Sequence, residues 1–523
     1  MTIEQLRTQY LDIFGEEGLP TDGVVPQRAP EPALLLCFTN RSGSNYLAEL
    51  LRSTQLLARG HEAFNPPFVQ RHLDRWELNE RTLVSFARNL RPRVTRQGGS
   101  PPVFKIGWHQ LFVLAETGVL DTVFPNRRLV IIRREDLLAQ AVSFTIASRT
   151  GAWTSAHTDR DAELDIEPAE VHDRIRSVLV ATRHFREFAA VTGDEVLDVT
   201  YEQVEGNPQR AVDRIFEFAG LPRTPIDPSV VRTSRQRSER NAEIAEMVVT
   251  DARRHLEGRV RPAVEPDGVF PVRYTSTHVT QRLSQIWGPG ILAESSGRSV
   301  DDPPLVDNLV LVVHSVYADA SRLCRWLVSS DAIDNRVERL LPVDSEGAHP
   351  DGLLSHLRAA VQVDPGAQHR LALVRPFELC WLLDTRLVPR VIALPRVIFV
   401  RRVDLESAGH DMFGEWHVPS PPDAVDATRE HIRAVAGSEA EGAAAAAVFA
   451  LPSAELVIGD PLLDVVDHRD RIATLLDLDP DVLDVPDAAI FRHAVSDRRI
   501  RGAREGVEAV WPLGVEISER PVG

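Results

Sequence analysis

Apolar and polar residues follow one another along the chain in blocks that predict strands separated by amphipathic helices. Short apolar runs rich in Val, Ile and Leu are typical of buried strands, and longer segments with helical spacing predict helices. This order is typical of an α/β protein with a mostly parallel central sheet and flanking helices. In the first half the predicted strands are Ala33–Phe38, Val103–Gly107, Arg128–Ile132 and Glu195–Val199, and the predicted helices are Ser44–Leu57, Asp136–Arg149, Pro168–Thr192 and Pro208–Ala219.

A segment rich in Gly, Pro and Ser divides the chain near its middle. It reads GPGILAESSGRSVDDPP at Gly288–Pro304, a composition typical of a linker. The length of 523 residues also exceeds what one hydrophobic core usually contains. We therefore predict a first domain at 1–287, a linker at 288–304 and a second domain at 305–523.

The second half repeats the segments of the first half in the same order. ALLLCFTNRSGSNYLAELLRS from Ala33 aligns without a gap with LVLVVHSVYADASRLCRWLVS from Leu309. Further pairs follow with spacings that differ by only a few residues, as expected if only loops differ. This order predicts two tandem copies of one domain. The further pairs begin at Val103 and Leu373, Leu129 and Val397, Val196 and Glu455, and Asp213 and Asp470.

The two copies differ in their candidate chemistry. The loop NRSGSN at Asn40–Asn45 becomes VYADAS at Val316–Ser321, which has lost both the arginine and the glycine. Ser143 aligns with Asp411, whose charge would repel a phosphate. We therefore expect the first copy to hold an anion site and the second to keep only the fold.

Composition excludes several classes of partner. A net charge of −17 argues against general affinity for nucleic acid or acidic membranes. No run approaches the roughly 18 apolar residues of a membrane span, and the N-terminus lacks a basic start followed by an apolar stretch. These features predict a cytoplasmic protein. Cys37, Cys324 and Cys380 lie in apolar runs without CxxC spacing, so we expect core residues and neither disulfides nor metal ligands.

The loop RSGSN at Arg41–Asn45 has the features of an anion site. Gly43 permits a sharp turn that points backbone N–H groups at one anion, and the following helix N-terminus adds partial positive charge. Arg41 supplies a full charge. The leading glycine and the lysine of a Walker loop, GxxxxGK[ST], are missing, which disfavours an ATP-dependent kinase.

A second basic cluster follows a later strand, in RREDLLAQAVS at Arg133–Ser143. Asp136 can cap the next helix, and Ser143 returns to the capping face about two turns later. An arginine at the strand end and this serine can bracket a second phosphate on the same sheet edge. The alternative is that Arg133 or Arg134 pairs with a neighbouring carboxylate on a solvated corner. Two phosphate sites indicate a nucleotide that carries phosphate at two positions.

Together with VFKIGWHQL and VTYEQVEGNPQRAVDRIFEFAGLP, these motifs resemble bacterial sulfotransferases of the trehalose 2-sulfotransferase (Stf) type over about residues 30–260. The resemblance implies a P-loop-like sulfotransferase fold. It also implies transfer of a sulfuryl group from 3′-phosphoadenosine 5′-phosphosulfate (PAPS) to a hydroxyl of a sugar, glycolipid or other small metabolite. The product would be 3′-phosphoadenosine 5′-phosphate (PAP), and no metal is expected.

The resemblance also implies roles for individual residues. Arg41, Ser42, Gly43, Ser44 and Asn45 would form the loop for the 5′-phosphosulfate, and Arg133 and Ser143 would bind the 3′-phosphate. Glu62, in GHEAFNPP, would be the general base, with His61 as the alternative.

Three further residues have weaker support, and each has a structural alternative. Lys105 could approach the sulfuryl group or form a strand-end salt bridge. Tyr201 could line the adenine or pack in the core. Arg235 lies where the family places late phosphate contacts, or on a solvated basic face.

The second half has two candidate roles. Because the family implies a homodimer as the working unit, the fused copy could act as a built-in partner in a pseudo-dimer that closes the acceptor pocket. The competing hypothesis is a scaffold or recognition module. For the whole chain, a non-catalytic nucleotide-binding protein is the alternative to an enzyme, and the identity of the acceptor is left open.

Overall fold

The structure is a computed structural model of the chain. It describes residues 3–19, 32–58, 60–76, 78, 80–95, 100–153, 164–231, 239–256, 272–287, 308–314, 317–334, 338–341, 353–360, 367–385, 387–390, 392–402, 439–440, 442–458 and 465–485. The predicted linker at 288–304, Asp411 and Arg235 lie outside these residues.

The first half contains a parallel sheet with the order β2-β1-β3-β4. Its strands agree with the predicted ones to within one residue at either end. Helices cover both faces, which explains the continuous apolar runs of these strands. Because the strands are parallel, their carboxyl ends meet at one edge of the sheet. The strands are β1 (Ala33–Phe38), β2 (Val103–Ile106), β3 (Arg127–Arg133) and β4 (Glu195–Thr200).

Alternate residues of the strands face two different apolar layers. Leu34 and Leu36 pack with α2 (Ser44–Ser53) and α10 (Pro208–Ala219) on one face. Leu35 and Cys37 pack with helices on the other face. The other helices of this half are α1 (Ile3–Phe14), α3 (Pro66–Leu73), α4 (Leu83–Arg93), α5 (Trp108–Glu116), α6 (Val119–Val123), α7 (Leu137–Thr150), α8 (Pro168–Thr192), α9 (Tyr201–Gly206), α11 (Glu239–Leu256) and α12 (Val272–Trp287).

Helix ends follow the capping residues. Asp136 caps α7 as predicted, because its side chain accepts a hydrogen bond from the backbone N–H of Ala139 at 2.9 Å. The prediction that the helix from Ser44 reaches Leu57 was wrong. It ends at Ser53, and Gln55 adopts a positive φ of 61° that no α-helix continues through.

The second half contains a parallel sheet with the order β6-β7-β5-β8-β9. Without the two-residue β6, this order repeats β2-β1-β3-β4. The strands are β5 (Leu309–His314), β6 (Glu338–Arg339), β7 (Arg370–Val374), β8 (Arg396–Arg402) and β9 (Ser453–Ile458). The helices are α14 (Tyr317–Leu327), α15 (Leu353–Ala360), α16 (Pro376–Asp384), α17 (Leu387–Arg390) and α20 (Val465–Leu476).

The strand register supports the predicted repeat but shifts two of the aligned pairs by two residues, because it places Lys105 on Leu373 and Asp198 on Glu455. Phe38 pairs with Ile132 between β1 and β3, and His314 pairs with Val400 between β5 and β8. The gapless alignment places Phe38 on His314. Their strand partners Ile132 and Val400 therefore correspond, and so do the next residues, Arg133 and Arg401. Two sheets with the same order and the same register are consistent with two tandem copies of one fold.

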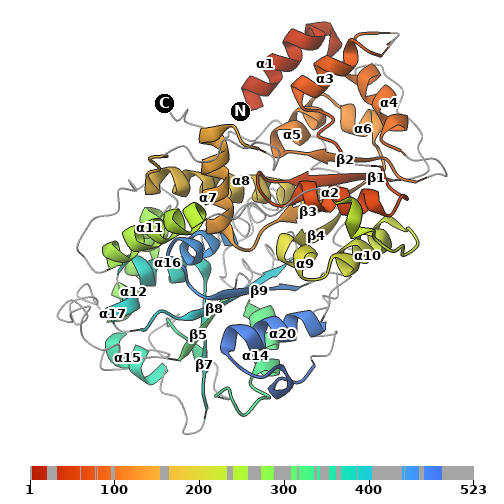
Figure 1. Cartoon of the computed structure of the whole chain (residues 1–523). Coiled ribbons are helices and arrows are strands. Elements are labelled where there is room, and N and C mark those ends of the chain that lie inside the picture. Colours follow the sequence, from red (N-terminus) through yellow and green to blue (C-terminus); the bar gives the residue numbers. More distant parts are fainter. Residues whose placement is uncertain are drawn as a thin grey trace, which may run out of the picture.

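The two halves share a hydrophobic core. Val279 and Leu283 of α12 are fully buried in one apolar cluster with Leu311 of β5 and Trp381 of α16. The same cluster includes Val142 and other side chains of α7, α8 and α11. Figure 1 shows these helices along the left side of the molecule, beside the two sheets, and β4 and β9 near its centre. The halves therefore meet through an extensive apolar interface.

A cluster of buried charges joins β3 and β4 to β8 and β9. Arg133 pairs with Asp198 at 2.7 Å and with Glu455 at 2.5 Å. Arg401 pairs with Asp198 at 2.8 Å and also with Glu455. Although burial opposes ionisation, the Arg401 and Arg133 guanidinium groups hold the pKa of Asp198 well below its usual range. The cluster is therefore charged at neutral pH.

His468 of α20 makes the stability of the folded chain depend on pH. Burial, with Arg471 close by, lowers its pKa to about 3. Because the unfolded side chain takes up a proton near pH 6.5, the free energy of unfolding decreases as pH falls from about 6.5 toward 3. Between pH 7 and 5 one such group costs about 2 kcal/mol. We expect His468→Gln to flatten the pH dependence by this amount, measured by urea unfolding at both pH values; an unchanged slope would contradict it.

Two further features agree with the composition. Cys37, Cys324 and Cys380 are buried and free, which confirms the prediction that they are core residues. Within the described ranges, no helix has the length and apolar character that crossing a membrane requires. The same ranges contain no group of three or more His, Cys, Asp or Glu side chains arranged for a metal ion.

Candidate functional site

The loop after β1 turns sharply at two residues with positive φ. Arg41 has a φ of 65°, and Gly43, which directly precedes α2, has a φ of 83°. The backbone N–H of Ser42 donates to the carbonyl oxygen of Thr39 at 3.2 Å and closes the turn. Because the first N–H groups of a helix lack intrahelical acceptors, the N-terminus of α2 presents donors at the carboxyl end of β1. The loop therefore has the backbone of an anion site.

One buried polar atom of this loop fits such a ligand. The side chain of Ser42 is fully buried, and its Oγ has no hydrogen-bond partner within the part of the chain that the structure describes. Leaving a buried hydroxyl unpaired costs about 1–3 kcal/mol. A phosphate oxygen would accept a hydrogen bond from it, so the residues present fit a phosphate-bearing ligand.

Helix α7 holds the loop from one side. Gln140 Nε2 donates to Thr39 Oγ1 at 2.8 Å and to the carbonyl oxygen of Asn40 at 2.7 Å. Arg41 Nε donates to Ser143 Oγ at 2.9 Å. Gln140 was not predicted from the sequence, although its position three residues before Ser143 places both on one helical face. Ser143 therefore contacts the first loop, and its binding of a 3′-phosphate stays a prediction.

Tyr201, the first residue of α9, packs against the loop from the other side. A Cβ atom on Gly43 would lie 2.4 Å from Cδ2 of the Tyr201 ring. The Tyr201 hydroxyl also lies 3.1 Å from Glu205 Oε1, to which it donates. Tyr201 thus contacts the predicted nucleotide loop, and a role at the adenine stays a prediction.

Gly43→Ala should destabilise the protein by about 2–5 kcal/mol. The left-handed backbone costs an L-residue about 1–2 kcal/mol, and displacing the Tyr201 ring costs about 1–3 kcal/mol more. Gly151→Ala is the matched control, because Gly151 has a φ of 71° and no atom within 4 Å of its added Cβ. Thermal unfolding of both variants measures the difference. Equal losses would show that the Tyr201 contact adds nothing.

Lys105 of β2 forms hydrogen bonds with two other polar side chains of the site, those of Glu62 and Asn45. Its Nζ donates to Glu62 Oε1 at 2.9 Å and to Asn45 Oδ1 at 2.5 Å. It also lies 4.9 Å from the centre of the Phe38 ring. Only 4% of the lysine side chain is exposed, so its charge is directed at these partners and not at bulk water. Lys105 forms the predicted salt bridge, and this salt bridge lies inside the site.

The two candidate bases, Glu62 and His61, differ in the contacts that hold their side chains. Asn65 Nδ2 donates to Glu62 Oε2 at 3.4 Å, so both carboxylate oxygens of Glu62 have a partner while 37% of the side chain is exposed. His61 is exposed, and its ring stacks 6.2 Å from that of Phe68. The Glu62 carboxylate contacts the Lys105 ammonium group, which also contacts Asn45, whereas His61 bonds to Lys105 through its backbone carbonyl oxygen at 2.8 Å. The geometry therefore connects Glu62 more closely than His61 to the loop.

Arg133 lies in a different environment from the predicted one. The alternative of a solvated corner does not hold, because its guanidinium is in the buried cluster with Asp198 and Glu455. Its neighbour Arg134 lies 3.7 Å from Glu202 and places its guanidinium 5.2 Å from the centre of the Tyr201 ring. Arg133 thus holds the interface in this structure, and its contact with a 3′-phosphate stays a prediction.

The second half has lost the corresponding loop. In the gapless alignment α14 begins at the counterpart of Arg41, three residues earlier than α2 does. The strand register places Leu373 at the position of Lys105 and Arg339 at that of Glu62. The second half therefore lacks the loop, the lysine and the carboxylate of the first.

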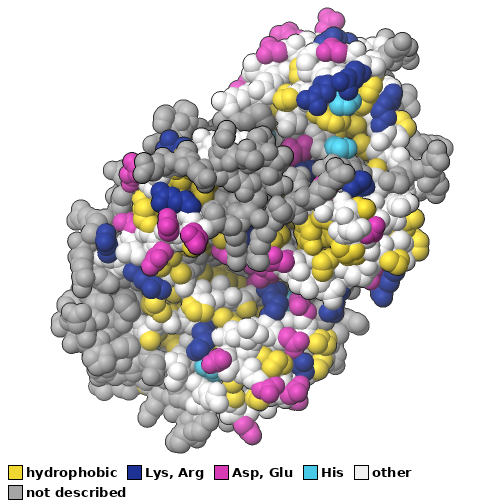
Figure 2. Space-filling view, in the orientation of Figure 1, with side chains coloured by type: hydrophobic (Ala, Val, Ile, Leu, Met, Phe, Trp, Pro, Cys, Tyr) yellow, Lys and Arg dark blue, Asp and Glu magenta, His cyan; other side chains and the backbone are white. Residues whose placement is uncertain are grey.

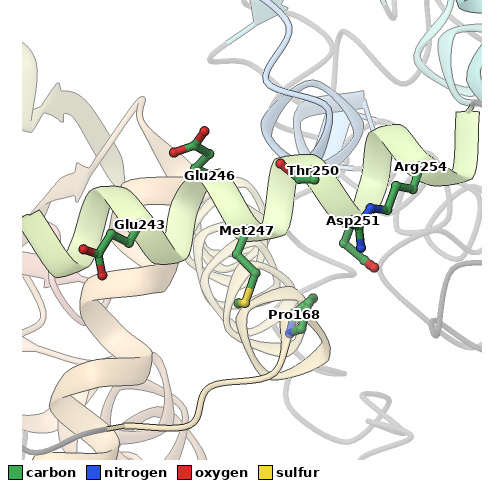
Figure 3. Close-up of a pocket in the computed structure, with 7 residues that line it drawn as sticks. All are labelled: Pro168, Glu243, Glu246, Met247, Thr250, Asp251 and Arg254. Carbon is green, nitrogen blue, oxygen red and sulfur yellow. The ribbon is translucent and has the colours of Figure 1, made fainter.

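A separate open cavity of about 470 Å³ lies between α11 and the start of α8. Figure 3 shows Met247 pointing toward Pro168, while Glu246 projects from the opposite side of α11. None of the loop residues lines this cavity. It is therefore distinct from the site around Arg41 and Glu62.

Comparison with known proteins identifies one part of the chain. A family model described as Stf0 sulphotransferase matches residues 33–248, from β1 into α11. This range contains every side chain of the site described above. No curated protein matches the chain.

Proposed function

Because residues 33–248 match the Stf0 sulphotransferase family model, we propose that the protein transfers a sulfuryl group from PAPS to a hydroxyl of a small-molecule acceptor. The observation that carries the proposal is the meeting of the Arg41–Asn45 segment, through Asn45, with Lys105 and Glu62 at one sheet edge. Such a transfer requires a loop that binds the donor, a fixed positive charge and a carboxylate base close to one another. Lys105 supplies that charge, because it contacts both Asn45 and Glu62.

The loop would hold the 5′-phosphosulfate of the donor. The positive φ angles at Arg41 and Gly43 support donation of backbone N–H groups to an anion. The buried Ser42 hydroxyl, which has no partner among the described residues, would donate a further hydrogen bond. Ser44 begins α2, and Asn45 is held by Lys105. When bound, PAPS supplies an activated sulfuryl group. The chain supplies the fixed positive charges around it.

Ser143 and Tyr201 would contact the remainder of the nucleotide. Both adjoin the loop, through Arg41 and Gly43 respectively. Arg133 and Arg235 belong to this proposal only through the resemblance of their motifs to the family. Arg133 would have to exchange a carboxylate partner in order to bind phosphate.

Glu62 would act as the general base. A base needs to reach the acceptor hydroxyl, and the exposed part of the Glu62 side chain gives it that access. Lys105 and Asn65 restrict where the carboxylate points. The hydroxyl proton would move to a Glu62 oxygen as the acceptor oxygen bonds to sulfur, while the bond between sulfur and the 5′-phosphate oxygen of PAPS breaks and PAP leaves.

The acceptor class and compartment are also part of the proposal. On the face in Figure 2 the described basic and acidic side chains are interspersed, which favours a small acceptor over nucleic acid. Three buried free thiols favour the cytoplasm. The second half would act as a built-in partner in a pseudo-dimer, because it packs on the first through a shared core.

The test is calorimetric titration of the full chain with PAP, 5′-AMP and ATP. We expect PAP to bind most tightly and Arg41→Ala to weaken it by at least about tenfold, as for loss of a charge-assisted hydrogen bond. Arg52→Ala is the control, because Arg52 lies at the far end of α2. Absence of PAP binding by the unmodified protein, or a preference for ATP, would overturn the donor assignment.

A further inference from the structure

We propose that charged residues of the second half, Glu455, Arg401 and Arg471, are positioning residues for the donor loop of the first half. The inference rests on the proposed function, because the loop that these residues position is the one proposed to bind the donor. It assigns the second half a role in the geometry of the loop, in addition to covering apolar surface.

The central charge cluster has the form of an interface between two copies. In the aligned registers Arg133 corresponds to Arg401, and Asp198 to Glu455. Each arginine pairs with the carboxylate of its own half and with that of the other half. Such reciprocal pairing is the signature of a two-fold contact, in which residue i meets j and j meets i.

The charge cluster lies at the carboxyl ends of β3 and β4, which lead into α7 and α9, the two helices that contact the loop. Arg133 is the last residue of β3, which leads into α7 with Gln140 and Ser143. Asp198 is near the end of β4, which leads into α9 with Tyr201. The two helices that contact the loop therefore start from strands whose ends are joined to the second half.

A second link reaches the turn between β3 and α7. Arg471 of α20 pairs with Glu135 at 2.5 Å. The backbone N–H of Glu135 donates to Glu202 at 3.0 Å, and Arg134 lies against the Tyr201 ring. The turn is thus held between α20 of the second half and α9 of the first. Losing the charge on Arg471 would free the turn, and with it the starts of both helices.

A second ion pair between the halves allows the positioning of the loop to be distinguished from the stability of the interface. The ion pair between Arg282 and Glu378, at 2.6 Å, also joins the halves and is partly buried. It connects α12 to α16 and has no contact with the β3–α7 turn among the interactions described here. Glu378→Gln is therefore a matched control that weakens the interface at a different place.

The experiment compares Arg471→Gln, Arg471→Lys and Glu378→Gln in the full chain. The first readout is amide hydrogen exchange of residues 39–45 without ligand, which is independent of the proposed chemistry. We expect Arg471→Gln to speed this exchange about tenfold, Arg471→Lys to stay within about threefold of the unmodified protein, and Glu378→Gln to leave it unchanged. Unchanged exchange in Arg471→Gln, or equal acceleration in Glu378→Gln, would overturn the inference.

The second readout is the dissociation constant of PAP. Arg471→Gln should raise it about tenfold while Glu378→Gln leaves it within about twofold, even if both lower the melting temperature. Equal PAP affinity of all three variants would overturn the positioning role. If the unmodified protein does not bind PAP, the proposed function fails, and loop exchange alone decides the inference.

Discussion

Replacing Glu62 by glutamine should lower kcat for sulfuryl transfer by about 10²–10⁴-fold, because a positioned general base contributes this much to proton transfer. PAP binding should change little. Glutamine has the shape of glutamate, and its Oε1 can still accept the hydrogen bond from Lys105. The loss should therefore appear in the chemical step. The measurement is release of PAP from PAPS in the presence of a hydroxyl acceptor found by screening sugars, glycolipids and phenols.

His61→Asn tests the alternative base. The histidine ring is exposed and stacks on Phe68, and His61 bonds to Lys105 through its backbone, which the substitution keeps, so we expect this variant to retain most of the activity. A loss of kcat with His61→Asn as large as that with Glu62→Gln would assign both residues to the reaction. Full activity of Glu62→Gln would remove Glu62 as the base.

Removing the second half should prevent the first from folding to a soluble monomer. A fragment ending at Trp287 would expose Val279 and Leu283 of α12, which are fully buried in the shared core on the helix that packs against α16. Each such side chain stabilises the fold by about 2 kcal/mol when buried. The loss would also leave Arg133 and Asp198 with fewer partners. We expect the fragment to aggregate or to melt far below the full chain, as measured by size-exclusion chromatography and thermal unfolding.

Cleavage of the full chain within 288–304 provides the control. Both pieces are then present, so the apolar interface stays covered and we expect the pieces to elute together with an almost unchanged melting temperature. If the fragment alone were monomeric and as stable as the full chain, the shared core would have no energetic importance.

Much of the fold could be predicted because it depends on local pattern. The continuous apolar runs of Ala33–Phe38 and Glu195–Thr200 mark buried parallel strands, and Asp136 marks a helix start. Gly43 marked the sharp turn for the same local reason. Helix Ser44–Ser53 was predicted too long, since nothing in its apolar spacing shows that Gln55 leaves the helical region.

The candidate site was predicted in part. Arg41, Ser143, Tyr201, Lys105 and Glu62 were singled out from their motifs, and the structure places them around one loop. Gln140 was missed, because a buried amide that holds a backbone carbonyl leaves no pattern in one sequence.

By itself, the sequence determined the α/β class, the order of the strands along the chain, the likeness of the two halves and the loop that carries the candidate chemistry. Each of these depends on residues that are neighbours along the chain or recur at a fixed spacing. Only the tertiary structure decided that Arg133 pairs with Glu455, and that Arg471 holds Glu135. These partners are hundreds of residues apart, so their meeting depends on how two sheets pack, and local periodicity contains no record of that packing.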